Sequence, residues 1–523
     1  MSRAFLVLAC FALTAQAPVP TAQPAAGGTV ASILGARKMA LARLGVRRRK
    51  RLEISGLLTG LDLHGSFHTW QDGERERSDE NLGIRSQSVL RLGDREYITN
   101  ASGNVRRLRG LLAKRQRSED FIDSEAFLEQ PQYAKLVSRV VLPGGNEAFD
   151  IAVSPPEGQP LDVYVDTKTF MIDRMSYVDS DASTTIDYSD YRNAEGTLVA
   201  YTEVTSDGDH PYDITQTTTE VRAGKPIDGA VFAVPKTTEI ETQTPITVPL
   251  RQRRGHLYAA VTLRGRTYDF LLDTGSQGIV VDTRVADETL LLPEGKLEVS
   301  GARRTGGLGL ASLDSITIGG ARLPVKVVSV LDLASATGGS TDIEGILGYP
   351  FFAASEVRID SAKMTMTFAR PGTLAPGGVK LDVDVDRELP EILASVDGTQ
   401  GRFLVDTGNG NELLIFHRFA QEHPGRISYV GQMPTTNFGV GGSTRAVSSI
   451  ISELDIGPFR LFNRRGDIML TDTGAFADQF DAGNIGLPVL RNFITTFDLA
   501  NEAMYLEQGP NFDDGRYRPV IEP

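Results

Sequence analysis

The sequence has little of the residue types on which thiol and metal chemistry depend. Among its 523 residues there are one cysteine, Cys10, and six histidines. Because Cys10 lies in the predicted export signal described below, the rest of the chain has no thiol nucleophile and no disulfide. His64 and His68 would need a helix to converge on a metal, and their surroundings predict strands. The sequence therefore predicts no metal site and no cofactor.

Positive charge and long apolar runs are also scarce. The formal net charge is −13 at pH 7, which argues against nucleic acid as a partner. The basic run at 47–51 is interpreted as a solvated helix end. Beyond the first residues, no apolar run reaches the length of a transmembrane helix. Serines are plentiful, but they form no Gly-x-Ser-x-Gly elbow of a serine hydrolase. We expect a soluble protein.

Residues 1–27 have the outline of a signal peptide followed by a Pro/Ala-rich stretch. A positive residue precedes the apolar segment 4–13, and Ala15-Gln16-Ala17 is a candidate cleavage site. We therefore expect an exported protein, periplasmic or extracellular. Val7-Leu8-Ala9-Cys10 resembles a lipoprotein box, but the apolar segment is short, which disfavours lipid anchoring at Cys10.

Aromatic residues make up 7% of the chain and glycines number 53. Many short apolar runs bounded by Gly, Asp and Pro predict a mainly β fold, and the length predicts two or three domains. We expect a β domain over 28–235, with a leading helix over 29–44 that ends at Gly45 and a second helix over 125–136. Its early strands are expected at 52–54, 61–63, 89–92 and 97–98. The many antiparallel strands favour an open or partly closed barrel.

A short motif occurs twice in the second half of the chain. Asp273-Thr274-Gly275-Ser276 follows the apolar run 270–272, and Asp406-Thr407-Gly408-Asn409 follows 403–405. Each run predicts a buried strand that places a carboxylate at the end of a sheet. The threonine offers a hydroxyl to neighbouring backbone, and the glycine permits close approach of a second turn. Asp-Thr-Gly occurs by chance at roughly one in several thousand positions, so two copies in matching context are significant.

The two copies belong to a longer internal repeat. Gly345-Ile346-Leu347-Gly348 in the first copy matches Gly483-Asn484-Ile485-Gly486 in the second, and each is followed by a short hairpin. The repeat predicts a linker over 236–249, one module over 250–372, a second module over 379–512 and a tail over 513–523. Each module contributes one reactive carboxylate.

These motifs resemble those of the aspartic peptidase family, specifically its retropepsin-like lobes in bacterial proteins, over about residues 247–512. The resemblance implies an acid protease fold, in which two β lobes bring Asp273 and Asp406 together across one cleft. It also implies that Thr274 and Thr407 lock the turns together and that a polypeptide is the substrate. The second copy departs from the family at Asn409 and at Asn484, where an apolar residue is usual.

Two carboxyl groups about 3 Å apart share one proton. The ionised member then takes a proton from water, while the neutral member hydrogen-bonds the scissile carbonyl. The sequence does not assign which aspartate is the base. We expect Ser276 to donate to the outer oxygen of Asp273, and Asn409 to do so less well for Asp406. The resemblance further implies a hairpin flap, for which the candidate tip residues are Gly306, Gly307, Gly309, Gly439, Gly441 and Gly442.

The amino-terminal half resembles the periplasmic lipoprotein-carrier (LolA/LolB-like) family. The features that carry this resemblance are the leading helix and the segments 51–56, 162–170, 187–191 and 227–232. The resemblance implies a half-barrel whose apolar concave face holds a lipid or a lipoprotein segment. Whether this domain binds lipid or only positions the peptidase lobes stays open at this point.

Two hypotheses follow for the whole chain. The first is an exported aspartic endopeptidase, monomeric because both acids come from one chain. The second is a non-catalytic periplasmic protein that binds peptides, lipid or lipoproteins. A third Asp-Thr-Gly, at 472–474, lacks a following apolar strand and is predicted to be a surface loop.

Overall fold

The computed structural model describes residues 28–46, 50–179, 182–208, 210–300, 304–337, 343–427, 430–471 and 474–517. The predicted signal peptide and the Asp-Thr pair of the third motif lie outside the described residues. The fold is mainly β, as predicted. The chain forms two compact units, of which the first holds most of the chain up to Pro235 and the second holds 236 onward together with the short segment 99–106.

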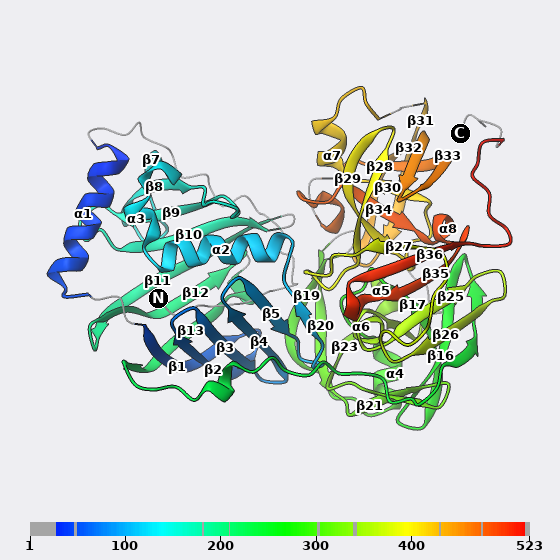
Figure 1. The fold of residues 1–523 in the computed structure, drawn as a ribbon, viewed down its shortest axis with the longest axis horizontal. Helices are drawn as coiled ribbons and strands as arrows, with labels where there is room; N and C mark the ends of the chain where they lie inside the picture. Colours follow the sequence, from blue (N-terminus) through cyan, green and yellow to red (C-terminus); the bar gives the residue numbers. More distant parts are fainter. Residues whose placement is uncertain are drawn as a thin grey trace. The chain divides into compact units, whose positions relative to one another are not determined.

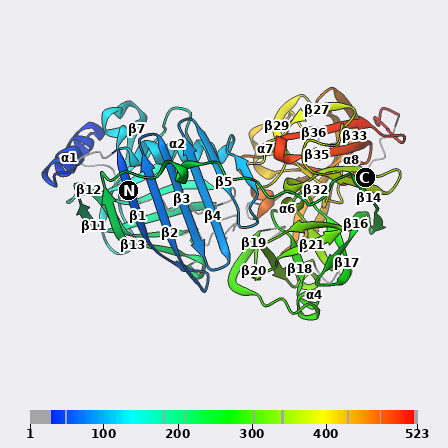
Figure 2. The same ribbon diagram turned by 60° about the horizontal axis from the view of Figure 1, so that its bottom comes forward.

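The strands of the first unit belong to one antiparallel sheet of thirteen strands, and Figure 2 shows its first strands side by side. It is a meander in which β1 pairs with the last strand, β13. In spatial order its strands are β6 (Val105–Arg107), β5 (Arg95–Thr99), β4 (Arg85–Leu92), β3 (Arg75–Leu82), β2 (Leu63–Asp72), β1 (Arg51–Gly60), β13 (Ile214–Ala223), β12 (Thr197–Ser206), β11 (Ala182–Ala194), β10 (Ile172–Asp179), β9 (Leu161–Asp166), β8 (Glu147–Val153) and β7 (Ala134–Val141).

Two strand predictions near the start of this sheet were wrong. The segment 61–63 was predicted as a strand, but Leu61 and Asp62 form a two-residue turn in which both φ values are positive, 58° and 56°. Such a turn matches the twist of the hairpin that it closes. Strand β3 was not predicted because its sequence is polar, although it buries Glu76, Ser78 and Glu80 in strict alternation.

Helices cover one part of this sheet (Figure 1). Helix α1 (Val30–Arg43) begins at the cap Thr29 and ends before Gly45, close to its predicted bounds. Helix α2 (Leu111–Asp123) was not predicted, because its sequence is highly charged. The helix expected over 125–136 is shorter: α3 (Ala126–Glu129) and a 3₁₀ turn, η1 (Pro131–Tyr133), precede β7.

The helices fill the apolar face of the sheet with their own side chains. Ile33 and Leu34 of α1, Ile122 of α2 and Phe127 of α3 are buried in one cluster with strands β8 to β12. Towards β3 and β4 ion pairs add to the packing, because Arg91 pairs with Glu76 at 3.1 Å and with Asp120 of α2 at 3.2 Å. A second apolar cluster joins Val89 of β4 and Ile98 of β5 to Leu112 of α2. The described helices therefore occupy the face implied by the carrier resemblance.

The second unit contains two lobes with the same strand topology. In the first lobe the ten-stranded sheet has the order β19 (Glu294–Ser300), β20 (Arg304–Ser312), β23 (Val327–Leu331), β18 (Val280–Asp282), β24 (Gly345–Leu347), β17 (Arg266–Leu272), β16 (His256–Leu263), β21 (Ser315–Ile318) and β22 (Ala321–Pro324), with β15 (Arg251–Arg253) paired to β16. In the second lobe the seven-stranded sheet has the order β28 (Glu391–Val396), β29 (Thr399–Asp406), β34 (Gly483–Gly486), β30 (Leu413–Ile415), β33 (Phe459–Met469), β32 (Gly442–Ile456) and β31 (Val430–Gly439).

A six-stranded sheet joins the two lobes. Its order is β14 (Ile246–Pro249), β26 (Thr365–Ala369), β25 (Glu356–Asp360), β35 (Phe493–Asp498), β36 (Ala503–Gln508) and β27 (Val379–Asp382). The repeated hairpins β25–β26 and β35–β36 meet in the middle, where β25 and β35 pair antiparallel. Strand β14 lies in the segment that was predicted to be a linker, so 246–249 is part of the lobe structure.

Short helices follow corresponding strands in the two lobes. Helix α6 (Tyr349–Ala354) follows β24, and α8 (Leu487–Leu490) follows β34. The remaining helices are α4 (Thr283–Glu288), α5 (Leu333–Ala336) and α7 (His417–Glu422), with 3₁₀ turns η2 (His210–Tyr212), η3 (Gly229–Phe232), η4 (Ala475–Ala477) and η5 (Leu499–Asn501) elsewhere.

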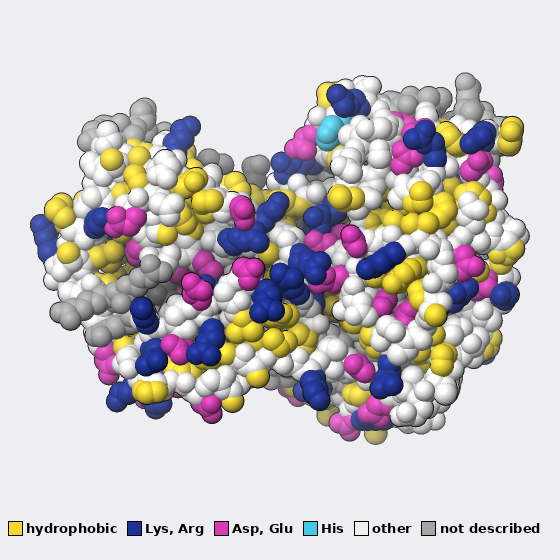
Figure 3. Space-filling view, in the orientation of Figure 1, with side chains coloured by type: hydrophobic (Ala, Val, Ile, Leu, Met, Phe, Trp, Pro, Cys, Tyr) yellow, Lys and Arg dark blue, Asp and Glu magenta, His cyan; other side chains and the backbone are white. Residues whose placement is uncertain are grey.

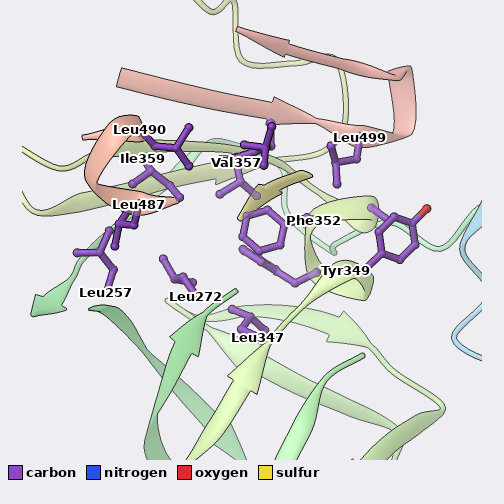
Figure 4. Packing of buried hydrophobic residues seen from close by; sticks show 14 of the residues in the cluster. Leu257, Leu272, Leu347, Tyr349, Phe352, Val357, Ile359, Leu487, Leu490 and Leu499 are labelled. Carbon is purple, nitrogen blue, oxygen red and sulfur yellow. The ribbon is translucent and has the colours of Figure 1, made fainter. Parts of the chain in front are cut away.

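The lobes share one hydrophobic core beneath the two Asp-Thr-Gly turns. Figure 4 shows Leu257, Leu272 and Leu347 from the first lobe packed with Leu487 and Leu490 from helix α8 of the second. All five are at most 4% exposed. A core drawn from both lobes resists their separation, because separation would return apolar surface to water.

No helix in the described ranges is long and apolar enough to span a membrane. Acidic and basic side chains occur together over the face drawn in Figure 3. Many form exposed pairs, such as Arg418 with Glu422 at 2.6 Å. Pairs of this kind contribute little to stability because water screens both charges.

A buried arginine organises the inner part of the second lobe. Arg387 contacts Glu391 at 2.7 Å and Asp478 at 2.5 Å, and it also pairs with Asp481. Each of the four side chains is at most 7% exposed. Asp478 and Asp481 depend on this cation, since charges without partners are very costly in the interior. Glu391 also pairs with Arg402 at 3.2 Å.

Arg387→Met is expected to lower the free energy of unfolding by about 3–5 kcal/mol, because it leaves buried carboxylates without their cation. Urea unfolding followed by circular dichroism measures the loss. Arg418→Met in the same lobe is the matched control, with an expected change within about 0.5 kcal/mol because its pair is exposed. Equal effects of the two substitutions would contradict this account of the cluster.

Candidate functional site

The two Asp-Thr-Gly turns are positioned by the same strand register. Strand β17 runs parallel to β24, with Leu271 opposite Ile346 and Leu272 opposite Leu347. Strand β29 runs parallel to β34, with Leu404 opposite Asn484. A Cβ atom built on Gly348 would lie 2.4 Å from the carbonyl oxygen of Ser276. Glycine at this position therefore lets the segment pass directly beneath the turn.

Crossed hydrogen bonds join the two turns. The Thr274 hydroxyl donates to the Val405 carbonyl at 2.6 Å, and the Thr407 hydroxyl donates to the Leu272 carbonyl at 3.0 Å. The Thr274 hydroxyl also accepts from the Thr407 backbone N–H at 3.0 Å, and the Thr407 hydroxyl accepts from the Thr274 backbone N–H at 3.1 Å. Both threonines are 1% exposed, so these four bonds form away from competing water.

This linkage brings the two carboxyl groups together. A Cβ built on Gly275 would lie 2.5 Å from Asp406 Cγ, and one built on Gly408 would lie 2.3 Å from Asp273 Cγ. Each carboxyl therefore packs against the glycine of the opposite turn, where no other residue leaves space.

Burial and the neighbouring acid change the protonation of this pair. Burial, followed by the charge of Asp406 and the hydrogen bond to it, raises the pKa of Asp273 well above its usual value. The backbone N–H of Gly275, which donates to Asp273 Oδ1 at 2.9 Å, acts in the opposite direction. An acid with a raised pKa beside a second carboxyl can hold a shared proton at a pH where isolated carboxyls are ionised.

The hydrogen bonds around the two acids are not symmetric. Asp406 Oδ1 accepts the backbone N–H groups of Gly408 at 2.8 Å and Asn409 at 3.0 Å, while its Oδ2 accepts the side-chain amide of Asn484 at 2.7 Å. Among the described residues, the backbone N–H that donates to Asp273 is that of Gly275.

The predicted role of Ser276 was wrong. Its hydroxyl donates to the Gly278 carbonyl at 3.1 Å instead of to Asp273, because the turn folds back and presents that carbonyl first. The Asn409 side chain likewise does not donate to Asp406. Its amide donates to Asn484 Oδ1 at 3.0 Å, and its contact with Asp406 is through the backbone.

Two residues beside the pair were not predicted as site residues. Asn484 appeared in the sequence as a departure from the apolar pattern, which was the available signal. His256 begins β16 and lies against Gly410, with its Cε1 3.3 Å from a Cβ built there. Burial lowers the pKa of His256, although the charge of Asp406 opposes this shift. No local spacing links His256 to a turn about 150 residues away.

The candidate flap glycines occupy different places in the two hairpins. Gly439, Gly441 and Gly442 lie at the turn between β31 and β32. Gly306, Gly307 and Gly309 lie within β20, so their prediction as a hairpin tip was wrong. Gly309 is explained by packing instead, because a Cβ there would lie 2.6 Å from Pro293 Cβ.

The second-lobe hairpin reaches the first lobe. The Gly441 backbone N–H donates to the Ala336 carbonyl of α5 at 2.9 Å. Val440 packs on an apolar cluster of the first lobe that includes Leu331 and Leu333, and Leu308 from β20 joins the same cluster. A pocket of about 170 Å³ lies here, lined by Gly306, Gly307, Leu331, Asp332, Ser335, Ala336 and Gly441.

Within the described ranges, no group of three or more His, Cys, Asp or Glu side chains is arranged to hold a metal ion. Asp273 and Asp406, both half-buried, lie against each other's turns. Two neighbouring carboxyl groups of this kind can share a proton.

A family model described as aspartyl protease matches residues 259–351 of the chain. The matched segment contains Asp273, both strands that flank its turn, and the Gly345–Leu347 strand beneath it. It therefore agrees with the resemblance that the sequence motifs carry for the first lobe. A search of curated proteins gives no match.

Solved structures also resemble the amino-terminal part of the chain. A DUF1329 family protein from Desulfovibrio piger is 13% identical, with a TM-score of 0.29, covering 40% of this chain and 98% of its own. An outer membrane lipoprotein-sorting protein domain from Vibrio parahaemolyticus is 10% identical, with a TM-score of 0.28, covering 39% and 95%. A LolA superfamily protein from Nitrosomonas europaea is 11% identical, with a TM-score of 0.27, covering 40% and 99%.

Thr274→Val and Thr407→Val are each expected to lower the free energy of unfolding by about 1–3 kcal/mol, since each removes a donor and leaves a buried N–H unpaired. The double variant should lose less than the sum of the two, because both substitutions break one set of bonds. Denaturant titration of the four proteins measures the coupling. Thr267→Val, which breaks only an exposed contact with Thr262, should change stability by less than about 0.5 kcal/mol. Strict additivity would contradict the crossed arrangement.

Proposed function

We propose that this protein is an aspartic endopeptidase, a hydrolase that cleaves peptide bonds with water activated between Asp273 and Asp406. The observation that carries the proposal is that each lobe holds its aspartate against the turn of the other lobe, with the buried Thr274 and Thr407 linking the turns. The aspartyl protease match over residues 259–351 supports it.

The chemistry follows from one proton shared by two acids. The ionised carboxyl takes a proton from a water molecule as the water oxygen bonds to the scissile carbonyl carbon. The protonated carboxyl donates to the carbonyl oxygen, which balances the charge that develops there. The tetrahedral intermediate then collapses, the C–N bond breaks, and the leaving amine receives a proton from the pair. No covalent bond to the protein forms in this scheme.

The β31–β32 hairpin is proposed as the flap over a polypeptide substrate. Its tip bonds to α5 through Gly441, and its arm contacts the site because Asn411 donates to Asn437 at 3.3 Å. A hairpin anchored at both places limits the access of water to the site and offers backbone hydrogen-bonding groups to an extended peptide. The substrate enters once the Gly441 contact opens.

No catalytic role is assigned to the first unit. The export signal predicts a periplasmic or extracellular enzyme, and both acids come from one chain, so a monomer suffices. A lipid or lipoprotein ligand remains a prediction from the carrier resemblance. The described helices α1, α2 and α3 already fill the apolar face, so a lipid would have to displace one of them.

Asp273→Asn and Asp406→Asn are each expected to lower kcat/KM for peptide cleavage at least about 10³-fold, because neither variant can both activate water and supply the shared proton. Cleavage of a diverse peptide library, read by mass spectrometry, measures the loss. The exposed Asp314→Asn in the first lobe should retain wild-type activity. Persistent cleavage by either site variant would refute the proposal.

The pH dependence of cleavage follows from the raised pKa of Asp273. A raised pKa keeps this acid protonated as pH rises past the usual carboxyl range, and activity falls only when pH passes the raised value. Cleavage should therefore continue well above pH about 4, the pKa of an unperturbed aspartate. A profile of kcat/KM against pH tests this. Loss of activity on rising through pH 4 would contradict a pair that shares a proton.

A further inference from the structure

We propose that Asn484 is a positioning residue that holds the negative charge of the pair on Asp406 and leaves the shared proton on Asp273. The inference rests on the proposed peptidase function and extends it by assigning the two acids different roles. In this assignment Asp406 takes the proton from water, and Asp273 donates to the scissile carbonyl.

The first argument is the difference in hydrogen-bond donors. Asp406 accepts three N–H groups, two on Oδ1 at 2.8 and 3.0 Å and that of Asn484 on Oδ2 at 2.7 Å. Asp273 accepts one, from Gly275 at 2.9 Å. An N–H donor stabilises the ionised form of a carboxyl group over its neutral form. The singly ionised pair therefore places its charge on Asp406.

The second argument is that the orientation of the Asn484 amide is fixed by a relay. The Asn411 backbone N–H donates to Asn409 Oδ1 at 2.9 Å, and Asn409 Nδ2 donates to Asn484 Oδ1 at 3.0 Å. With its oxygen held in this way, Asn484 must direct its Nδ2 donor towards Asp406. Both departures from the family pattern, Asn409 and Asn484, are thus parts of one chain of hydrogen bonds.

Among the described residues of the first lobe, no corresponding chain of hydrogen bonds reaches Asp273. Ile346 occupies the register position that corresponds to Asn484, because Leu271 pairs with Ile346 as Leu404 pairs with Asn484. The isoleucine side chain has no hydrogen-bond donor, and the Ser276 hydroxyl donates to the Gly278 carbonyl. The asymmetry is therefore encoded in residue types at equivalent positions.

Three other titratable or charged groups lie near Asp406. Asp273 faces it from the opposite turn, and His256 faces it from β16. Arg491, which donates to the Gly255 carbonyl at 2.7 Å, lies beside His256. Burial lowers the pKa of His256, so this ring is neutral once pH exceeds its usual value and over part of the range below it.

The test is the pH profile of kcat/KM for peptide cleavage by Asn484→Leu. The acidic limb reports gain of a second proton by the pair, and the basic limb reports loss of the shared one. Asn484 stabilises the Asp406 carboxylate in both the singly and the doubly ionised pair. Removing Asn484 should therefore raise the apparent pKa of the acidic limb by about one unit and leave that of the basic limb unchanged.

A different result would identify the opposite assignment. If the shared proton were on Asp406, Asn484 would stabilise only the doubly ionised pair. Its loss would then raise the apparent pKa of the basic limb alone. A shift confined to the basic limb, or no shift of either limb, would overturn the inference. A merely structural role would lower activity equally at every pH.

Two further variants serve as matched controls. Asn409→Ala breaks the relay but keeps Asn484, so it should move the acidic limb in the same direction by a smaller amount. Ile346→Asn places a donor at the equivalent position of the first lobe. Because that donor stabilises only the doubly ionised pair, it should lower the apparent pKa of the basic limb and leave that of the acidic limb unchanged.

A measurement that does not depend on peptide cleavage distinguishes failure of this inference from failure of the proposed function. Carbon-13 NMR of aspartate-labelled wild type and Asn484→Leu follows the two deprotonations of the pair directly, and thermal melting confirms that the variant is folded. Absence of cleavage by wild type at every pH would refute the peptidase proposal alone. An unmoved first deprotonation in the labelled variant would refute the role of Asn484.

Discussion

The crossed hydrogen bonds between Thr274 and Thr407 are the constraint on which the site depends. Each hydroxyl donates to a carbonyl of the opposite lobe and accepts a backbone N–H from the opposite threonine. Neither turn is satisfied without the other, because buried N–H groups need partners. The same bonds fix the approach of each carboxyl group to the opposite glycine. The chemistry is thus a consequence of how two copies of one module close on each other.

The rest of the second unit supports this closure. The repeated hairpins pair across the shared six-stranded sheet, and helices α6 and α8 begin with N–H groups of Tyr349 and Leu487 that donate to the turn residues Ser276 and Asn409. Departures from the duplication then make the halves unequal. Asn484 donates a hydrogen bond to Asp406, whereas its counterpart Ile346 has no side-chain donor. The described tip of the second-lobe hairpin bonds to the first lobe. We propose that these asymmetric residues, set in a duplicated architecture, give the two acids different roles.

The sequence predicted the parts that follow from local patterns. The apolar run before each Asp-Thr-Gly specified a buried strand and a turn, and the repeat specified that there are two such strands. It did not predict α2, whose charged sequence packs on the sheet through the buried Leu112 and Ile122 and through the ion pair of Asp120 with Arg91. Leu61 and Asp62 were predicted as strand because their alternation matches a strand, whereas the turn depends on backbone dihedral angles that alternation does not encode.

Side-chain hydrogen bonds were the least predictable feature. Ser276 was expected to donate to Asp273, but its hydroxyl donates to a carbonyl two residues further along the chain. His256 and Asn484 reach the pair only through contacts between segments far apart in the chain. Such contacts depend on the packing of complete lobes. A motif search therefore finds the two acids but misses the residues that surround them.

The central claim is that one chain brings two acids together to hydrolyse peptides. Cleavage of a diverse peptide library by the wild-type chain, with and without a statine-containing peptide that mimics the tetrahedral intermediate, tests this claim most directly. The account predicts cleavage that the inhibitor abolishes at one molecule per chain. Absence of both cleavage and inhibitor binding at every pH from acid to neutral would contradict it.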